Sequence, residues 1–106
     1  MTRKTYDLIV AGEINPDLII SGDVVPEFGQ VEKLVDTFNL TIGSSSVIFA
    51  CGAARLGLRV AFVGVCGDDV FGNFMLEKMR QRNIDVGNVI IKKERQTGFS
   101  VILSRD

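Results

Sequence analysis

The chain has 106 residues, of which 46% are hydrophobic and 24% charged, and its formal net charge at pH 7 is −1. These values are typical of one soluble globular unit and exclude a disordered tail or a collagen-like chain. The nearly balanced charge gives no basis for binding nucleic acid or an anionic membrane surface. The chain has no histidine, the side chain that most often serves as a general base.

The first predicted element is a buried strand at Asp7–Ile14, where apolar and β-branched residues form a short run. This run is too short for a signal peptide or a membrane span. Asn15-Pro16-Asp17 then interrupts the strand, because proline cannot donate a hydrogen bond to a neighbouring strand. A turn alone would also explain this tripeptide. Glu13, at the strand end beside Asn15, could face a ligand, but a structural hydrogen bond is expected of it.

Two extended segments follow, at Leu18–Ser21 and Leu34–Ile42, with loop signals at Gly22-Asp23 and Pro26 between them. Apolar and polar residues alternate along the second segment. This alternation favours a strand with one face buried and one exposed, as in antiparallel sheets.

The middle of the chain predicts helix, strand and helix in turn. Apolar residues recur at helical spacing over Ser44–Arg55, and Gly57 stands where a C-terminal cap is expected. Arg59–Cys66 is almost entirely apolar and predicts a strand buried on both faces. An aspartate of Gly67-Asp68-Asp69 is expected to cap the amphipathic helix predicted at Phe71–Arg82.

The last predicted elements are strands at Val86–Ile91 and Thr97–Leu103. The second of these has no predicted partner and ends in mid-pattern, so the chain is expected to be cut rather than finished. The alternation of buried strands and helices predicts the α/β class, with a parallel Rossmann-like sheet and flanking helices. The half-polar strands, including Thr97–Leu103, are expected to form an appended antiparallel piece.

Polar residues follow several of these elements at the places where ligands collect in α/β sheets. Asn15 and Asp17 come after the first strand, and an ionised carboxylate can accept hydrogen bonds from two hydroxyls of a polyol. Gly43–Ser46 opens a helix whose first N–H groups point outward and can hold oxygen atoms. Helix capping alone would also explain the serines, and turn chemistry would explain Gly67–Asp69.

The two cysteines, Cys51 and Cys66, lack the spacing of a metal site and are interpreted as small core residues. This use of cysteine predicts a reducing, cytoplasmic location. Neither the glycine fingerprint of a dinucleotide fold nor the lysine motif of a phosphate loop is present.

Taken together, these segments resemble the ribokinase-like carbohydrate kinases of the phosphofructokinase B type. The resemblance runs through GEINPDLII (Gly12–Ile20), the long segment Gly43–Val86 and QTGFSVIL (Gln96–Leu103). ARLGLRVAFVGVCGDDVFG is its most specific stretch. The family's N-terminal signature is kept at Gly43, Ala50, Gly57 and Gly67.

The resemblance implies a role in sugar binding for five residues. Asn15 and Asp17 would bind sugar hydroxyls, and Gly43 and Ser44 would offer backbone N–H donors. Phe99, within Thr97-Gly98-Phe99, would place its side chain over the ligand.

The resemblance also implies an architecture and partners. Residues 1–106 would form the N-terminal part of a sugar-kinase domain, and residues 18–42 and 97–106 would be lid strands that cover the sugar. These strands often form a dimer interface in the family, so a homodimer is expected. The full-length enzyme would use ATP and Mg²⁺, neither of which this portion is expected to bind.

Two departures from the family pattern limit what the resemblance implies. Ile42 replaces the first glycine of the signature and Ile48 replaces its asparagine, so no particular sugar is implied. The family's catalytic aspartate belongs to a D-T-x-G-A-G-D motif, which Asp36-Thr37 does not reproduce, so the base is expected beyond residue 106.

The leading interpretation of the chain is the sugar-binding and lid portion of an ATP-dependent carbohydrate kinase. A non-catalytic sugar-binding or dimerising module and a nucleoside kinase are the alternatives.

Overall fold

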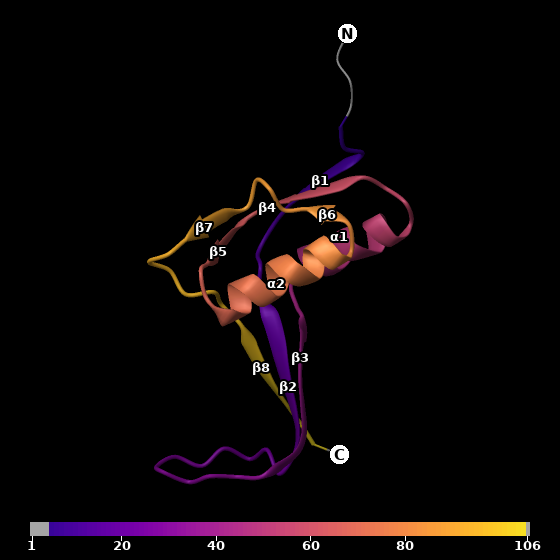
Figure 1. Cartoon of the computed structure of the whole chain (residues 1–106). Helices are drawn as coiled ribbons and strands as arrows, with labels where there is room; N and C mark the ends of the chain where they lie inside the picture. Colours follow the sequence, from indigo (N-terminus) through magenta and orange to yellow (C-terminus); the bar gives the residue numbers. More distant parts are fainter. Residues whose placement is uncertain (1–4, 106) are drawn as a thin grey trace.

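The computed structural model describes residues 5–105 of the chain. Residues 1–4 and Asp106, the last residue of the predicted lid segment, lie outside the described residues. The molecule is elongated, with extents of 63 × 33 × 17 Å, because a stalk of strands projects from an α/β layer (Figure 1). Neither helix of the described part is long and apolar enough to cross a lipid bilayer.

The α/β layer is built on a parallel sheet of three strands in the order β1-β4-β6. The strands are β1 (Leu8–Ala11), β4 (Val60–Val63) and β6 (Ile84–Asp85), joined through α1 (Ser45–Arg55) and α2 (Val70–Gln81). Because the two crossovers step across the sheet in the same direction, right-handed connections place both helices on the same face. The predicted α/β class with a parallel sheet and flanking helices is confirmed.

The core lies between this sheet and its two helices. Phe62 of β4, Val47 and Ala50 of α1, and Met75 and Met79 of α2 are completely buried in it. Burial of each larger side chain contributes roughly 1.5–3 kcal/mol. The apolar spacing that predicted the two helices therefore corresponds to real core-facing stripes.

Strand β1 is less buried than its sequence predicts. Val10 faces the core, but Ile9 on the opposite face is 64% exposed. Among the described residues β1 pairs only with β4, and both helices lie on the other side of the sheet. The expectation of a fully buried strand is wrong for this face, because periodicity does not reveal whether a second layer covers a sheet.

The predicted strand Arg59–Cys66 is divided at Gly64. β4 ends before this glycine and β5 (Val65–Gly67) begins after it. A Cβ atom on Gly64 would lie 2.6 Å from the backbone oxygen of Gly12, so only glycine allows this close approach of two chain segments.

The predicted strand Val86–Ile91 is wrong in its bounds. β6 ends at Asp85, and a turn follows in which the Val89 amide donates to the carbonyl oxygen of Val86 over 3.0 Å. The chain becomes extended again only in β7 (Ile90–Lys92), which pairs in parallel with β5. A short apolar run does not distinguish one strand from two strand ends joined by a turn.

The stalk consists of β2 (Pro16–Gly22), β3 (Val35–Ile42) and β8 (Ser100–Ser104) in the order β3-β2-β8, and it is called the lid sheet below after the role that the family resemblance implies. The β2–β3 pair is antiparallel, as predicted, but β8 runs parallel to β2. Both β2 and β8 leave the α/β layer at the same end and run outward, which fixes their common direction (Figure 1). The expectation that Thr97–Leu103 lacks a partner is wrong, because β2 pairs with it.

The predicted cap of the first helix is confirmed. Gly57 has a φ of +94°, a conformation that favours glycine. Its amide donates to the Ala54 oxygen over 3.0 Å, and the Leu58 amide donates to the Ala53 oxygen over 3.2 Å. These are the two bonds of a Schellman motif, which satisfies carbonyl groups at the end of the helix.

Candidate functional site

Three of the predicted site residues meet at the junction between the α/β layer and the lid sheet. Asn15 precedes β2, Asp17 lies on it, and Gly43 follows β3. A Cβ atom on Gly43 would lie 2.5 Å from Asp17 Oδ1 and 2.6 Å from the backbone oxygen of Asn15. Asn15 and Asp17 are half-buried, so their polar atoms lie at a surface rather than inside the apolar core.

The Asn15 side chain is oriented by its neighbours. Its Nδ2 donates to Glu13 Oε2 over 3.1 Å, which confirms the structural hydrogen bond expected of Glu13. Its Oδ1 lies beside Gly98, where a Cβ atom would approach to 3.2 Å. The amide is therefore held in a defined direction, and the small residue at Gly98 leaves room around its oxygen.

Ser44 begins α1 in an uncommon backbone conformation. Its φ is +70°, a region that residues other than glycine seldom adopt, and its Oγ accepts from the Val47 amide over 3.5 Å. The predicted capping role is confirmed. At the same end of the helix, Gly12 packs so closely on the Ser46 side chain that a Cβ atom would collide with it. The first turn of α1 is thereby fixed against the end of β1.

Asp69 and Thr97 form a second polar junction between the two parts of the molecule. Asp69 Oδ1 accepts from the Gly72 amide over 2.8 Å, which confirms the predicted cap of α2. Its Oδ2 accepts from the Thr97 amide over 2.7 Å. Thr97 is buried, and its Oγ1 accepts from the Gly67 amide over 2.9 Å. These bonds attach the segment that leads into β8 to the first turn of α2.

The Asp69 carboxylate should make the folded state sensitive to acid. Burial opposes its charge, but the hydrogen bonds from Thr97 and Gly72 outweigh this and lower its pKa below the usual value. A carboxyl group with a lowered folded-state pKa stabilises the protein above its unfolded pKa of about 3.9, and this stabilisation is lost as pH falls through the folded pKa.

We therefore expect the free energy of unfolding to fall with acid more steeply for the unmodified chain than for Asp69→Asn. Urea denaturation at several pH values between 6 and about 2 measures this free energy for each protein. The reference is the pKa of about 3.9 that an aspartate has in the unfolded chain. Asp68→Asn is the control, because Asp68 is exposed and accepts only a long bond of 3.4 Å from Asn73. Equal pH dependence of Asp69→Asn and the unmodified chain would contradict this role.

Phe99, the fifth predicted site residue, lies between Gly98, which approaches Asn15, and the first residue of β8. Its ring packs against Phe71 of α2, with centroids 4.3 Å apart and an interplanar angle of 40°. Ser100, the next residue, pairs with Asp17 across β2 and β8. Phe99 itself precedes the first residue of β8, and its ring packs on α2. Its role over a sugar stays a prediction.

Ile42 and Ile48, the two residues that replace positions of the family signature, have different surroundings. Ile42 is half-buried and packs against the core. Ile48, which replaces the asparagine, is 53% exposed on α1. Neither side chain can donate or accept a hydrogen bond, so this end of α1 offers its ligands backbone groups and serine hydroxyls only.

The family of the chain follows from a comparison of its sequence with known families. Residues 6–106 match the pfkB family of carbohydrate kinases. The chain belongs to this family. The matched range includes both the α/β layer and the lid sheet of this pfkB chain.

Curated relatives of this pfkB chain are sugar kinases about three times as long. It is 32% identical over 104 residues to the 5-dehydro-2-deoxygluconokinase of Shouchella clausii, covering 95% of this chain and 30% of that protein. It is 33% identical over 102 residues to the ribokinase of Haemophilus influenzae, covering 94% of this chain and 32% of that one.

Solved structures show the same fold. The fructokinase of Halothermothrix orenii superposes with a TM-score of 0.74 at 29% identity, covering 92% of the pfkB chain and 33% of the fructokinase. The ribokinase of Arabidopsis thaliana, complexed with ribose and ATP, superposes with a TM-score of 0.85 at 22% identity, covering 94% and 32%. The chain therefore has the ribokinase-like architecture over about a third of the length of these enzymes.

Sequence reasoning missed the buried role of Thr97. It named Phe99 of Thr97-Gly98-Phe99 as the ligand contact and gave Thr97 no role, whereas Thr97 bonds to Gly67 and Gly98 approaches Asn15. A threonine before a glycine does not by itself indicate burial. The only signal was the position of this segment between two predicted elements that had to be connected.

Proposed function

We propose that this chain is the sugar-binding and lid portion of an ATP-dependent carbohydrate kinase. One observation carries the proposal: Asn15, Asp17 and Gly43 converge at the end of the parallel sheet of a pfkB family chain. Ligands of α/β folds bind outside the carboxyl ends of the strands, which is where β1 leads into Asn15. The parent reaction would transfer the γ-phosphoryl group of ATP to a sugar hydroxyl.

The arrangement suits a polyhydroxylated ligand. The Asp17 carboxylate accepts hydrogen bonds from two adjacent hydroxyls, and such charge-assisted bonds are about twice as strong as neutral ones. The Asn15 amide, held by Glu13, adds a group that can both donate and accept. Gly43 and Ser44 add backbone N–H donors at the positive end of α1.

Nucleotide and metal binding are assigned to other residues of a full-length kinase. Residues 5–105 contain no group of three or more His, Cys, Asp or Glu side chains that could hold a metal ion. On the family resemblance, ATP, Mg²⁺ and the catalytic base are proposed to belong to residues beyond 106. Because phosphoryl transfer depends on positioning and electrostatic stabilisation of both reactants, we expect this chain alone to have negligible turnover.

The function of Asp17 is tested by measuring sugar affinity. Isothermal titration with ribose, fructose and 5-dehydro-2-deoxygluconate would identify the sugar that binds most tightly, and nucleosides in the same panel test the nucleoside-kinase alternative. For that sugar, Asp17→Asn should weaken binding by about 1.5–3 kcal/mol, the size of a lost charged hydrogen bond. Glu77→Gln is the control, because Glu77 lies on α2 and pairs with Arg80 at 3.7 Å. Unchanged affinity in Asp17→Asn would remove this residue from the site.

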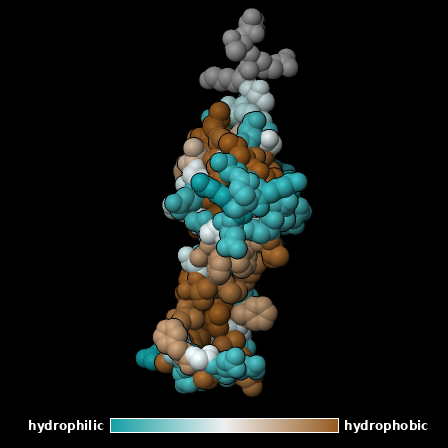
Figure 2. All heavy atoms as spheres, turned by 90° about the vertical axis from the view of Figure 1, so that its left-hand side faces the viewer, coloured by the Kyte–Doolittle hydropathy of each residue, from teal (hydrophilic) through white to brown (hydrophobic). Residues whose placement is uncertain are grey.

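We also propose that two copies associate through the lid sheet. Figure 2 shows hydrophobic side chains gathered over the stalk, and Phe38, Val101 and Leu103 are 71%, 49% and 45% exposed. Exposed strands with apolar side chains tend to pair with other strands. Sedimentation equilibrium should show a dimer that Phe38→Lys weakens. A monomer at all concentrations would contradict this association.

A cytoplasmic location is proposed on the state of the cysteines. Cys51 and Cys66 are both free rather than joined in a disulfide. Free thiols of this kind persist in reducing compartments. Fractionation of cells that express the chain would test the proposal.

A further inference from the structure

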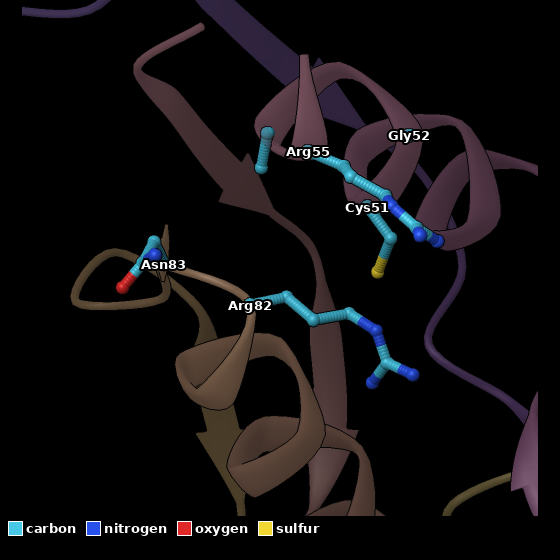
Figure 3. Close-up of a pocket in the computed structure, with 6 residues that line it drawn as sticks. Cys51, Gly52, Arg55, Arg82 and Asn83 are labelled. Atoms are coloured by element: carbon cyan, nitrogen blue, oxygen red, sulfur yellow. The ribbon is translucent and has the colours of Figure 1, made fainter. Parts of the chain in front are cut away.

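A cleft of about 410 Å³ lies between the C-terminal ends of α1 and α2. It is lined by Cys51, Gly52, Ala54, Arg55, Arg82 and Asn83. Figure 3 shows Arg55 extending from α1 and Arg82 from the end of α2, with the Cys51 sulfur between the two side chains. Both guanidinium groups reach toward the same side of the cleft. Its volume is in the range of clefts that bind small metabolites.

The lining of this cleft is positively charged and contains no carboxylate. Two arginines outside the cleft are paired, since Arg59 contacts Asp7 at 3.1 Å and Arg80 contacts Glu77 at 3.7 Å. Among the described residues, Arg55 and Arg82 form no salt bridge. Arg82 makes only a long bond of 3.4 Å to a backbone carbonyl of its own helix. Two positive charges therefore share one cleft without a counter-charge.

The charge of Arg82 acts inside the cleft. Burial raises the pKa of the Cys51 thiol, and the nearby Arg82 guanidinium opposes this shift. Basic residues at the ends of helices also complement the helix dipole, which accounts for one arginine on each helix. It does not account for the lack of a carboxylate among the residues that line the cleft, which leaves both charges available to an anion.

We propose that this cleft binds the phosphate group of a small phosphorylated metabolite between Arg55 and Arg82. A guanidinium group forms paired hydrogen bonds with phosphate oxygens, and two of them balance the charge of a phosphate dianion. Cys51 is half-buried and lines this cleft between the two arginines, so a ligand bound there should cover its sulfur.

This phosphate site is distinct from the proposed sugar site. Ser44 and Arg55 mark opposite ends of α1, which at about 1.5 Å per residue separates them by roughly 16 Å. A ligand at Arg55 therefore does not compete with a sugar at Asp17. The inference does not depend on the proposed kinase function and fails or stands separately from it.

The test combines calorimetry with the reactivity of Cys51 in the 106-residue chain. Inorganic phosphate and glycerol 3-phosphate are titrated at constant ionic strength, and we expect saturable binding with Kd on the order of 1–10 mM, typical of exposed charges. Alkylation of Cys51 by iodoacetamide should slow as the site fills. Cys66 is an internal control, because it is 3% exposed and reacts only on unfolding.

Matched variants decide whether the two arginines form the site. Arg55→Gln and Arg82→Gln should each weaken binding at least about tenfold and abolish the protection of Cys51. Arg80→Gln, which removes an arginine outside the cleft, should change neither. If a glutamine variant fails to fold, Arg55→Lys keeps the charge, loses the paired bonds and should still bind more weakly.

The relative affinities of the two ligands identify the kind of phosphate that binds. Tighter binding of glycerol 3-phosphate identifies an esterified ligand, and equal affinities identify free phosphate; either result supports the site. Absence of saturation, or equal losses in Arg80→Gln and Arg55→Gln, would overturn it.

Discussion

Gly43→Ala should abolish most of the sugar affinity while leaving the chain folded. The added Cβ would lie 2.5 Å from Asp17 Oδ1 and 2.6 Å from the backbone oxygen of Asn15, closer than Cβ atoms approach oxygen in proteins. The φ of Gly43 is not in the left-handed region, so alanine is compatible with the backbone and only the neighbours must move. Displacing Asp17 and Asn15 together should weaken binding at least about tenfold.

Gly52→Ala is the matched control for this substitution. Gly52 lies in α1, and a Cβ atom on it meets no other atom within 4 Å. Replacing a glycine inside a helix by alanine should stabilise the chain by roughly 0.5–1 kcal/mol and leave sugar affinity unchanged. Calorimetric titration measures affinity, and thermal denaturation measures stability. Equal sugar affinities in Gly43→Ala and Gly52→Ala would show that Gly43 does not position the site.

Thr97→Val should destabilise the fold by about 1–3 kcal/mol, although it keeps the shape of the side chain. Thr97 is 6% exposed, and its Oγ1 is the acceptor for the Gly67 amide at 2.9 Å. Valine would leave this buried N–H group without a partner, which costs more than the hydrogen bond itself contributes. The Thr97 amide would still donate to Asp69, so the loss reports the hydroxyl alone.

Thr97→Ser separates the hydroxyl from the methyl group. Serine keeps the acceptor for the Gly67 amide, so this variant should lose only the contribution of one buried methyl, about 1 kcal/mol. Urea denaturation of the three proteins gives both differences in free energy. If Thr97→Val were as stable as the unmodified chain and more stable than Thr97→Ser, packing of the methyl group rather than the hydrogen bond would account for the stabilisation by Thr97.

The helices and their ends could be predicted from sequence because their signals are local. Apolar spacing marks the buried stripes of α1 and α2, and Gly57 and Asp69 are capping residues with a defined backbone geometry. The direction of β8 could not be predicted in this way. Whether Ser100–Ser104 runs parallel or antiparallel to β2 depends on where the chain enters the lid sheet, and hydrophobic pattern is the same in both cases.

The candidate site was predictable only where the pairing of strands decides which residues meet. Asn15 precedes β2 and Gly43 follows β3, and antiparallel pairing of these two strands brings the start of one beside the end of the other, so the predicted pairing implies that the two residues converge. The positions of Phe99 and Thr97 depend on side-chain packing against Phe71 and on hydrogen bonds to Gly67, which are contacts between distant segments. The family resemblance named Phe99 of this segment for the ligand and gave no role to Thr97.

The most direct measurement is a titration of the ¹⁵N-labelled chain with ribose, fructose and 5-dehydro-2-deoxygluconate, followed by NMR. If sugar binds where Asn15, Asp17 and Gly43 meet, the amide signals of Gly43 and Ser44 and the side-chain amide of Asn15 shift together and saturate at one ligand concentration. Signals at the far end of α1, such as that of Arg55, stay unchanged. Saturable shifts confined to other parts of the chain, or no shift with any sugar, would contradict the account.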